Sequence, residues 1–117
     1  MITIRTTPIS VNKLYKGRKF LTDEGEATKL AMGWEAKIQW KKEPLTGNVE
    51  VKITFHFKDN RSDIDNCLKA LLDSLKGICW LDDKQIVDLY IHKRIDRVDP
   101  RIEIYVGIPN LLANPMN

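Results

Sequence analysis

Four aspartates in two close pairs are the residues of this chain whose types and spacing best suit chemistry. One residue separates Asp63 from Asp65, and Asp82 and Asp83 are adjacent farther along the chain. Carboxylates are hard ligands for Mg²⁺ or Mn²⁺, and Mg²⁺ commonly leaves coordination positions for water and phosphate. A metal held in this way polarises a phosphoryl oxygen and activates a bound water, which is phosphodiester hydrolysis. Lys69 shares a helical face with Asp65 and is the candidate cation for the transition state.

A helix must position these acids. It is predicted over about 63–76, because one apolar stripe recurs at helical spacing and Gly77 stands at the C-cap position. The stripe consists of Ile64, Leu68, Leu71, Leu72 and Leu75. A helix of about 14 residues is about 20 Å long. The link 77–81 would therefore have to fold back for the acid pair after the helix to meet the pair at its start.

The same acids also have ordinary structural interpretations. Asp63 or Asp65 could be a helix N-cap, where a carboxylate accepts backbone N–H groups. The series Asp65, Lys69 and Asp73 could be surface pairing along one helix face, and Asp82-Asp83 could be a solvated turn. Spacing alone leaves these alternatives open.

Aromatic residues and histidines add less specific signals. Trp80, beside the second acid pair, is expected to brace the site rather than to contact DNA. Trp34 and Trp40 fall in a predicted helix and are expected in the core or in an interface. His56 and His92 alternate with the apolar positions of strands, where hydrogen bonding is a more common role than catalysis.

The rest of the chain supplies a sheet and a second helix. Strands are predicted at 1–7, 49–58, 85–93 and 102–106. Residues 9–21 are predicted as an irregular loop, and a helix is predicted over about 23–40, after Thr22 as its N-cap. Helical spacing places five residues on one apolar face of this helix: Ala27, Leu30, Ala31, Trp34 and Ile38. The order β-α-β-α-β-β predicts one α/β (α+β) domain, with two helices on one face of a mixed four-stranded sheet.

Composition fits a globular domain of 117 residues, with 43% apolar and 30% charged residues. The net charge of +3 is mild and permits nucleic-acid binding without requiring it. No apolar run approaches the ~20 residues of a membrane span, and the N-terminus lacks signal-peptide character, so a cytoplasmic protein without a membrane partner is expected. Cys67 and Cys79 are expected to be buried, free thiols.

Basic residues gather away from the acids. Four occupy the predicted loop with no acid between them, namely Lys13, Lys16, Arg18 and Lys19. Tyr15 and Phe20 are interleaved with them. This pattern suits contact with a nucleic-acid backbone, although a solvated loop would have the same composition.

Two longer motifs resemble one known family, the RusA-like Holliday junction resolvases, which are crossover junction endodeoxyribonucleases often carried by prophages. The first motif is Arg61-Ser62-Asp63-Ile64-Asp65-Asn66 with Lys69, followed by Trp80-Leu81-Asp82-Asp83-Lys84-Gln85-Ile86-Val87. The second is Pro8-Ile9-Ser10-Val11-Asn12-Lys13-Leu14-Tyr15. With the length and the order of elements, the resemblance covers nearly the whole chain, 1–117.

The resemblance implies a homodimer that binds four-way DNA junctions and cuts two opposed strands symmetrically, in DNA recombination and repair. It implies Mg²⁺ or Mn²⁺ and no small-molecule cofactor. Catalytic roles fall on Asp63, Asp65, Asp83 and Lys69, with Asp82 as a further metal ligand and Arg61 and Lys69 among the DNA contacts. Two alternatives stay open: a junction-binding module that does not cut, and a metal-dependent nuclease for other branched DNA or RNA. Carboxylates repel phosphate, so they argue against the module.

Overall fold

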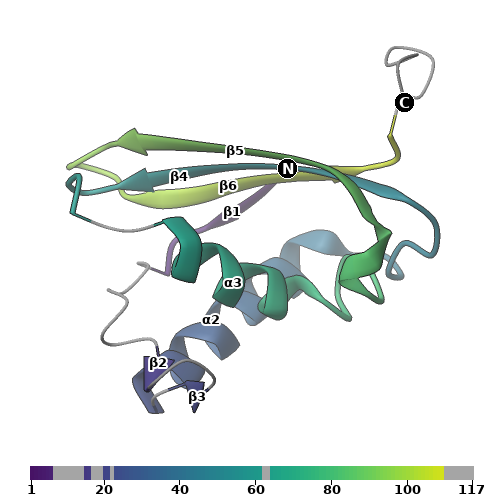
Figure 1. Cartoon of the computed structure of the whole chain (residues 1–117), viewed down its shortest axis with the longest axis horizontal. Coiled ribbons are helices and arrows are strands. Elements are labelled where there is room, and N and C mark those ends of the chain that lie inside the picture. Colours follow the sequence, from purple (N-terminus) through teal and green to yellow (C-terminus); the bar gives the residue numbers. More distant parts are fainter. Residues whose placement is uncertain (7–14, 17–19, 22, 62–63, 110–117) are drawn as a thin grey trace.

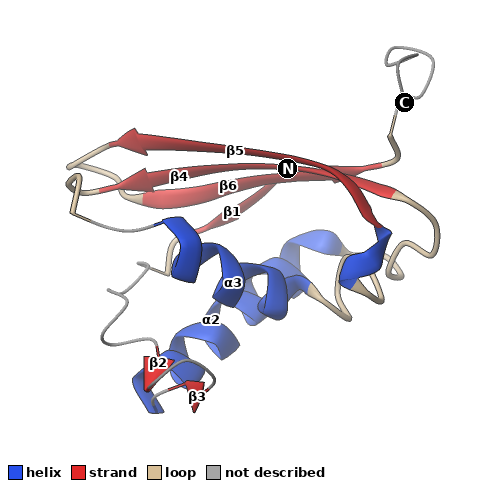
Figure 2. Ribbon diagram, in the orientation of Figure 1, coloured by secondary structure: helices blue, strands red, loops and turns tan. Residues whose placement is uncertain are grey.

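Four strands form a mixed sheet, and both long helices lie against one of its faces in the computed structural model of the chain (Figure 1; Figure 2). The structure describes residues 1–6, 15–16, 20–21, 23–61 and 64–109. The strands of the sheet are β1 (Ile2–Ile4), β4 (Val49–Phe57), β5 (Ile86–Ile95) and β6 (Arg101–Gly107). Their order is β1-β6-β4-β5, with β4 parallel to β5 and antiparallel to β6. The fold class predicted from the sequence is confirmed.

Strand β4 forms the centre of the core. Its alternating residues Val49, Val51, Ile53, Phe55 and Phe57 are buried, as the strict alternation in the sequence predicts. The intervening residues are half-buried or exposed, and the helices lie on only one side of the sheet (Figure 2). A two-layer arrangement follows, in which only one face of the sheet is covered.

Helix α3 (Ile64–Leu75) packs its predicted apolar stripe against this sheet. Ala70, Leu71 and Leu75 are fully buried. The chain leaves the helix at Gly77, whose φ of 87° is left-handed and favours glycine. The predicted helix and its C-terminal glycine are therefore confirmed, with the described helix beginning at Ile64.

Helix α2 (Asp23–Trp40) buries a different face from the apolar face that the spacing identified. Its buried residues are Gly25, Thr28, Met32 and Ala36. The large apolar residues of the predicted face are instead exposed, with relative exposures of 64%, 64% and 65% for Leu30, Trp34 and Ile38. These residues share one face of the helix, but apolar spacing does not distinguish a face that packs in the core from one that is left for another molecule.

Side chains of α2 also fix the edge of the sheet. Gln39 accepts a hydrogen bond from the backbone N–H of Thr3 at 2.8 Å and donates one to the carbonyl of Thr3 at 2.7 Å. Glu35 accepts from the backbone N–H of Arg5 at 2.7 Å. These bonds satisfy backbone groups that an edge strand leaves unpaired, so they set the position of α2 along β1.

Some predicted boundaries and loops need correction. Within the predicted loop 9–21, β2 (Tyr15–Lys16) and β3 (Phe20–Leu21) pair antiparallel. A strand of two residues has no measurable alternation, which is why the sequence did not reveal it. The first strand is shorter than predicted, and β5 continues to Ile95 because its parallel register with β4 runs to that residue.

Both cysteines are buried and free, as expected. Burial raises the pKa of the Cys79 thiol to about 12, so the thiol stays protonated and unreactive at neutral pH. In the part of the chain that the structure describes, no helix has the length and apolar content of a membrane span.

Candidate metal and DNA-binding site

Asp65 and the adjacent acids Asp82 and Asp83 lie near opposite ends of the sheet. Asp65 lies in the first turn of α3, which is the next element of the chain after β4. Asp83 lies just before Ile86, and Ile86 pairs with Val49, the first residue of β4. Strand β4 has nine residues, so its ends are about 26 Å apart. Asp63 is outside the described residues.

The described side chains of one chain therefore do not form a complete metal centre. Among residues 1–6, 15–16, 20–21, 23–61 and 64–109, no three His, Cys, Asp or Glu side chains gather closely enough to hold an ion. The link after α3 does not bring Asp82 and Asp83 back to Asp65. Their assignment as ligands stays a prediction.

A buried tryptophan holds Asp83 in place. Trp80 is fully buried, and its indole N–H donates to Oδ1 of Asp83 at 2.8 Å. Asp83 itself is half-buried and begins the short helix η1 (Asp83–Gln85). Trp80 thus braces this carboxylate and does not face solvent, as expected from its place beside the acids.

Asp82 has a structural role of its own. Its side chain accepts from the backbone N–H of Lys84 at 2.9 Å and caps η1. That hydrogen bond, above all, holds the pKa of Asp82 below its usual value. Gln85 completes the capping box by accepting from the backbone N–H of Asp82 at 2.9 Å. Asp82 therefore caps a short helix, a structural role that was not predicted for it from the sequence, and this role is compatible with metal binding.

Gln85 also ties the acid pair to a distant loop. Its amide nitrogen donates to the carbonyls of Leu45 and Gly47 at 2.7 and 2.8 Å. The sequence motif contained Gln85, but no role was predicted for it. The spacing of an Asp and a Gln three residues apart is the capping-box signal that could have revealed one.

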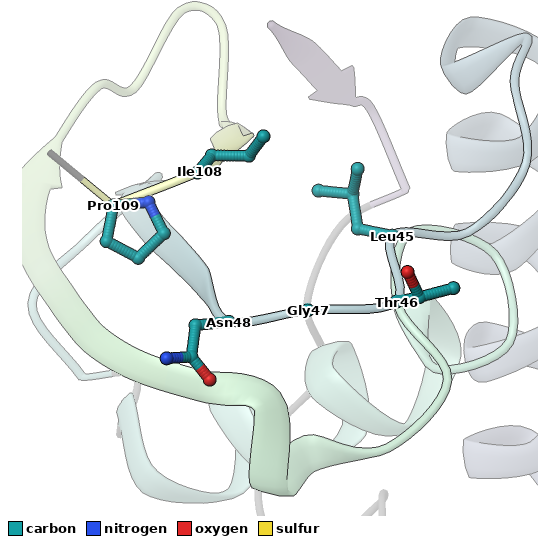
Figure 3. Close-up of a pocket in the computed structure, with 6 residues that line it drawn as sticks. All are labelled: Leu45, Thr46, Gly47, Asn48, Ile108 and Pro109. Atoms are coloured by element: carbon teal, nitrogen blue, oxygen red, sulfur yellow. The ribbon is translucent and has the colours of Figure 1, made fainter.

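A hollow of about 250 Å³ lies beside the same loop. Figure 3 shows its lining, which comes from the loop before β4 and from the chain after β6: Leu45, Thr46, Gly47, Asn48, Ile108 and Pro109. No charged side chain lines it. A phosphate or a metal ion would lack a charged partner there, so this hollow does not extend the acidic site.

At the other end of the sheet, Asp65 and Lys69 are both exposed and lie one helical turn apart. Arg61 lies shortly before them in the turn after β4, and its guanidinium donates to Oδ2 of Asp59 at 2.8 Å. Of the predicted basic loop, Lys16 lies on β2, whereas Lys13, Arg18 and Lys19 are outside the described residues.

Among the described residues, neither histidine forms a metal-binding group with the aspartates of the motif. His56 lies on the face of the sheet without helices, where its Nε2 is 2.6 Å from Oε1 of Glu103. His92 pairs in register with Thr54 and shares that face. The expectation of a hydrogen-bonding role is confirmed for His56.

Comparison with protein families agrees with the motif. The sequence model described as endodeoxyribonuclease RusA matches residues 6–107. The match covers most of the 117 residues, so the chain belongs to the RusA endodeoxyribonuclease family. Membership implies endonuclease activity of the Holliday junction resolvase kind, and nucleases of this family generally depend on a divalent metal. Comparison with curated protein sequences finds no match.

Proposed function

We propose that this chain is an Mg²⁺- or Mn²⁺-dependent endodeoxyribonuclease that resolves four-way DNA junctions by paired symmetric cuts, in DNA recombination and repair. The observation that carries the proposal is the family match over residues 6–107, which includes all four aspartates of the motif. Asp83 supports it further, because a fully buried indole orients this half-buried carboxylate. A rigidly held carboxylate is what a metal site needs.

The carboxylates of Asp63, Asp65, Asp82 and Asp83 are the proposed metal ligands. Oxygen donors of this kind suit a hard cation such as Mg²⁺. When bound, the metal would supply an activated water and polarise the scissile phosphate. Lys69 would place a positive charge near the phosphate, on the same helical face as Asp65.

A homodimer explains how acids at opposite ends of the sheet could serve one metal. Asp65 and Asp83 lie near opposite ends of β4, and Mg²⁺ requires its ligand atoms at about 2.1 Å. A second copy related by a two-fold axis could place its Asp83 beside Asp65 of the first. The same axis would then create two equivalent sites.

The exposed apolar stripe of α2 is the proposed contact between the copies. Leu30, Trp34 and Ile38 recur every four residues and are about two-thirds exposed. A groove of about 280 Å³ runs beside them, between α2 and the C-terminal half of α3. Lys37 and Asp73 both line this groove. In a two-fold contact, a charge of each sign beside an apolar centre can pair with its opposite on the partner, and this face offers both charges.

Junction cleavage by single-acid variants tests the function. Asp65→Asn and Asp83→Asn should each reduce cleavage in Mg²⁺ by at least about 100-fold, because a neutral amide is a poor ligand for a hard cation. Binding to a labelled junction in EDTA should persist. Asp88→Asn on β5 is the matched control and should cut normally. Normal cutting by Asp65→Asn or Asp83→Asn would exclude the proposed site.

The substrate panel should include junctions, forks, flaps, duplexes and single-stranded RNA. Preferential cutting of the four-way junction, with two symmetric products, supports resolution. Tight junction binding without cutting in Mg²⁺ or Mn²⁺ would instead identify a junction-binding module. Preferential cutting of flaps or RNA would identify a nuclease with another substrate.

A further inference from the structure

A basic cleft lies where two turns meet at one end of the sheet. The first turn, 58–61, links β4 to α3, and the second, 96–100, links β5 to β6 (Figure 1). The backbone N–H of Asp96 donates to the carbonyl of Phe57 at 2.7 Å, which joins the two turns directly. The cleft has a volume of about 440 Å³ and is lined by Lys58, Asp59, Arg61 and Arg97.

The aspartates of these turns already have arginine partners. Asp59 holds Arg61, Asp96 holds Arg101 at 2.9 Å, and Asp99 pairs with Arg5. Hydrogen bonds from Arg61 hold the pKa of Asp59 below its usual value, so its carboxylate stays charged and paired at neutral pH. These aspartates therefore pair with arginines.

Lys58 and Arg97 differ from these arginines. Both side chains are exposed, and within the described part of the chain no ion pair joins either of them to an acid. The turn that carries Arg97 is rigid, because Oδ1 of Asp96 accepts from the backbone N–H groups of Val98 and Asp99 at 3.1 and 3.0 Å. The cleft thus presents three cations from two fixed turns around one carboxylate that is already paired.

We propose that this cleft binds the phosphate backbone of the DNA strand next to the cutting centre, through Lys58 and Arg97 together with Arg61. Its position favours this role, because α3 begins three residues after Arg61 and carries Asp65 in its first turn. Arg61 can approach a phosphate with a planar fork, and Lys58 can add a mobile point charge. The inference rests on the proposed function and adds Lys58 and Arg97 to the substrate contacts that the sequence motif predicted.

The salt dependence of junction binding tests this assignment. Each cation on a phosphate adds about 0.9 to the slope of log K against log salt concentration. Lys58→Gln/Arg97→Gln should therefore flatten the slope by about 1.8 for one engaged cleft, and by about twice that when both clefts of a dimer bind. Full-length protein, a labelled four-way junction and EDTA allow binding to be measured without cleavage.

Two controls separate charge from structure. Arg97→Lys keeps the charge and should preserve the slope, whereas Arg97→Gln should flatten it by about 0.9 for one engaged cleft. Lys52→Gln removes an exposed lysine in the middle of β4, away from the turns at either end of the sheet, and should leave the slope unchanged. An unchanged slope in the double variant would overturn the assignment, while junction cutting by the wild type would show that the proposed function stands. A wild type that neither binds nor cuts junctions would refute the function itself.

Discussion

Two inactive variants should restore cleavage to each other if the cutting centre forms between protomers. One protomer carries Asp65→Asn and its partner carries Asp83→Asn. In a dimer with shared sites, one site then contains both substitutions and the other contains both original aspartates. In a dimer whose sites lie within single chains, each site would lack one acid and both would be inactive.

This expectation rests on the distance between Asp65 and Asp83 within one chain. The ends of β4 are about 26 Å apart, and each metal–oxygen bond is about 2.1 Å long. Asp83 is also held by the buried Trp80, so small rearrangements cannot close that distance within a chain. Random exchange of equal amounts gives about half heterodimers, each with one intact site. We therefore expect about one quarter of the wild-type site concentration and of the nicking rate.

A supercoiled plasmid that extrudes a four-way junction is the appropriate substrate. A heterodimer with one intact site should produce nicked circles and few linear molecules, because paired cutting needs both sites. Co-purification through two different tags shows that the subunits have exchanged. Tagged heterodimers that remain as inactive as either variant alone would refute the shared site and favour a centre within one chain.

Two further predictions concern the dimer contact and the acid brace. Burying a large apolar side chain stabilises by about 1.5–3 kcal/mol, and Trp34 is 64% exposed. Trp34→Ala should therefore destabilise the dimer by about 2–4 kcal/mol over two copies. Its dissociation constant should rise roughly 30- to 1000-fold. Sedimentation equilibrium measures this, and Val98→Ala, at an isolated residue with 95% exposure, is the control that should leave the dimer intact. Trp80→Phe removes the hydrogen bond to Asp83 and leaves space in the core. Urea unfolding should therefore show a free energy of unfolding that is lower by about 2–4 kcal/mol. An unchanged unfolding midpoint would show that the indole contributes little to stability.

The parts of the fold that the sequence predicted well have one buried face and a regular period. Apolar and polar residues alternate strictly from Val49 to Phe57, and the leucines of α3 recur at helical spacing. Each element therefore has a single apolar face, and that face packs in the core. Helix α2 did not follow this logic, because Gly25 and Thr28 lie on its buried face while Leu30 and Trp34 lie outside. Small residues permit close packing but give no apolar signal.

The relative position of the two acid pairs was beyond a sequence argument for another reason. Motif spacing counts residues along the chain, and a five-residue link after a helix can either reverse direction or continue. Here the parallel pairing of β4 with β5 requires the chain to return to the start of β4 before Ile86. Because α3 makes that return, its two ends, and with them Asp65 and Asp83, must lie apart.

This crossover connects the fold to the proposed paired cutting. In this β-α-β unit Asp65 and Asp83 lie near opposite ends of the helix, whereas a two-fold dimer can place each end beside the opposite end of its partner. Under the proposed arrangement a lone protomer has no complete metal site, so cleavage requires dimer formation. The two complete sites are then related by the same symmetry that relates opposed strands of a four-way junction. Under that arrangement, the separation of Asp65 from Asp83 within one chain is what would couple the two cuts.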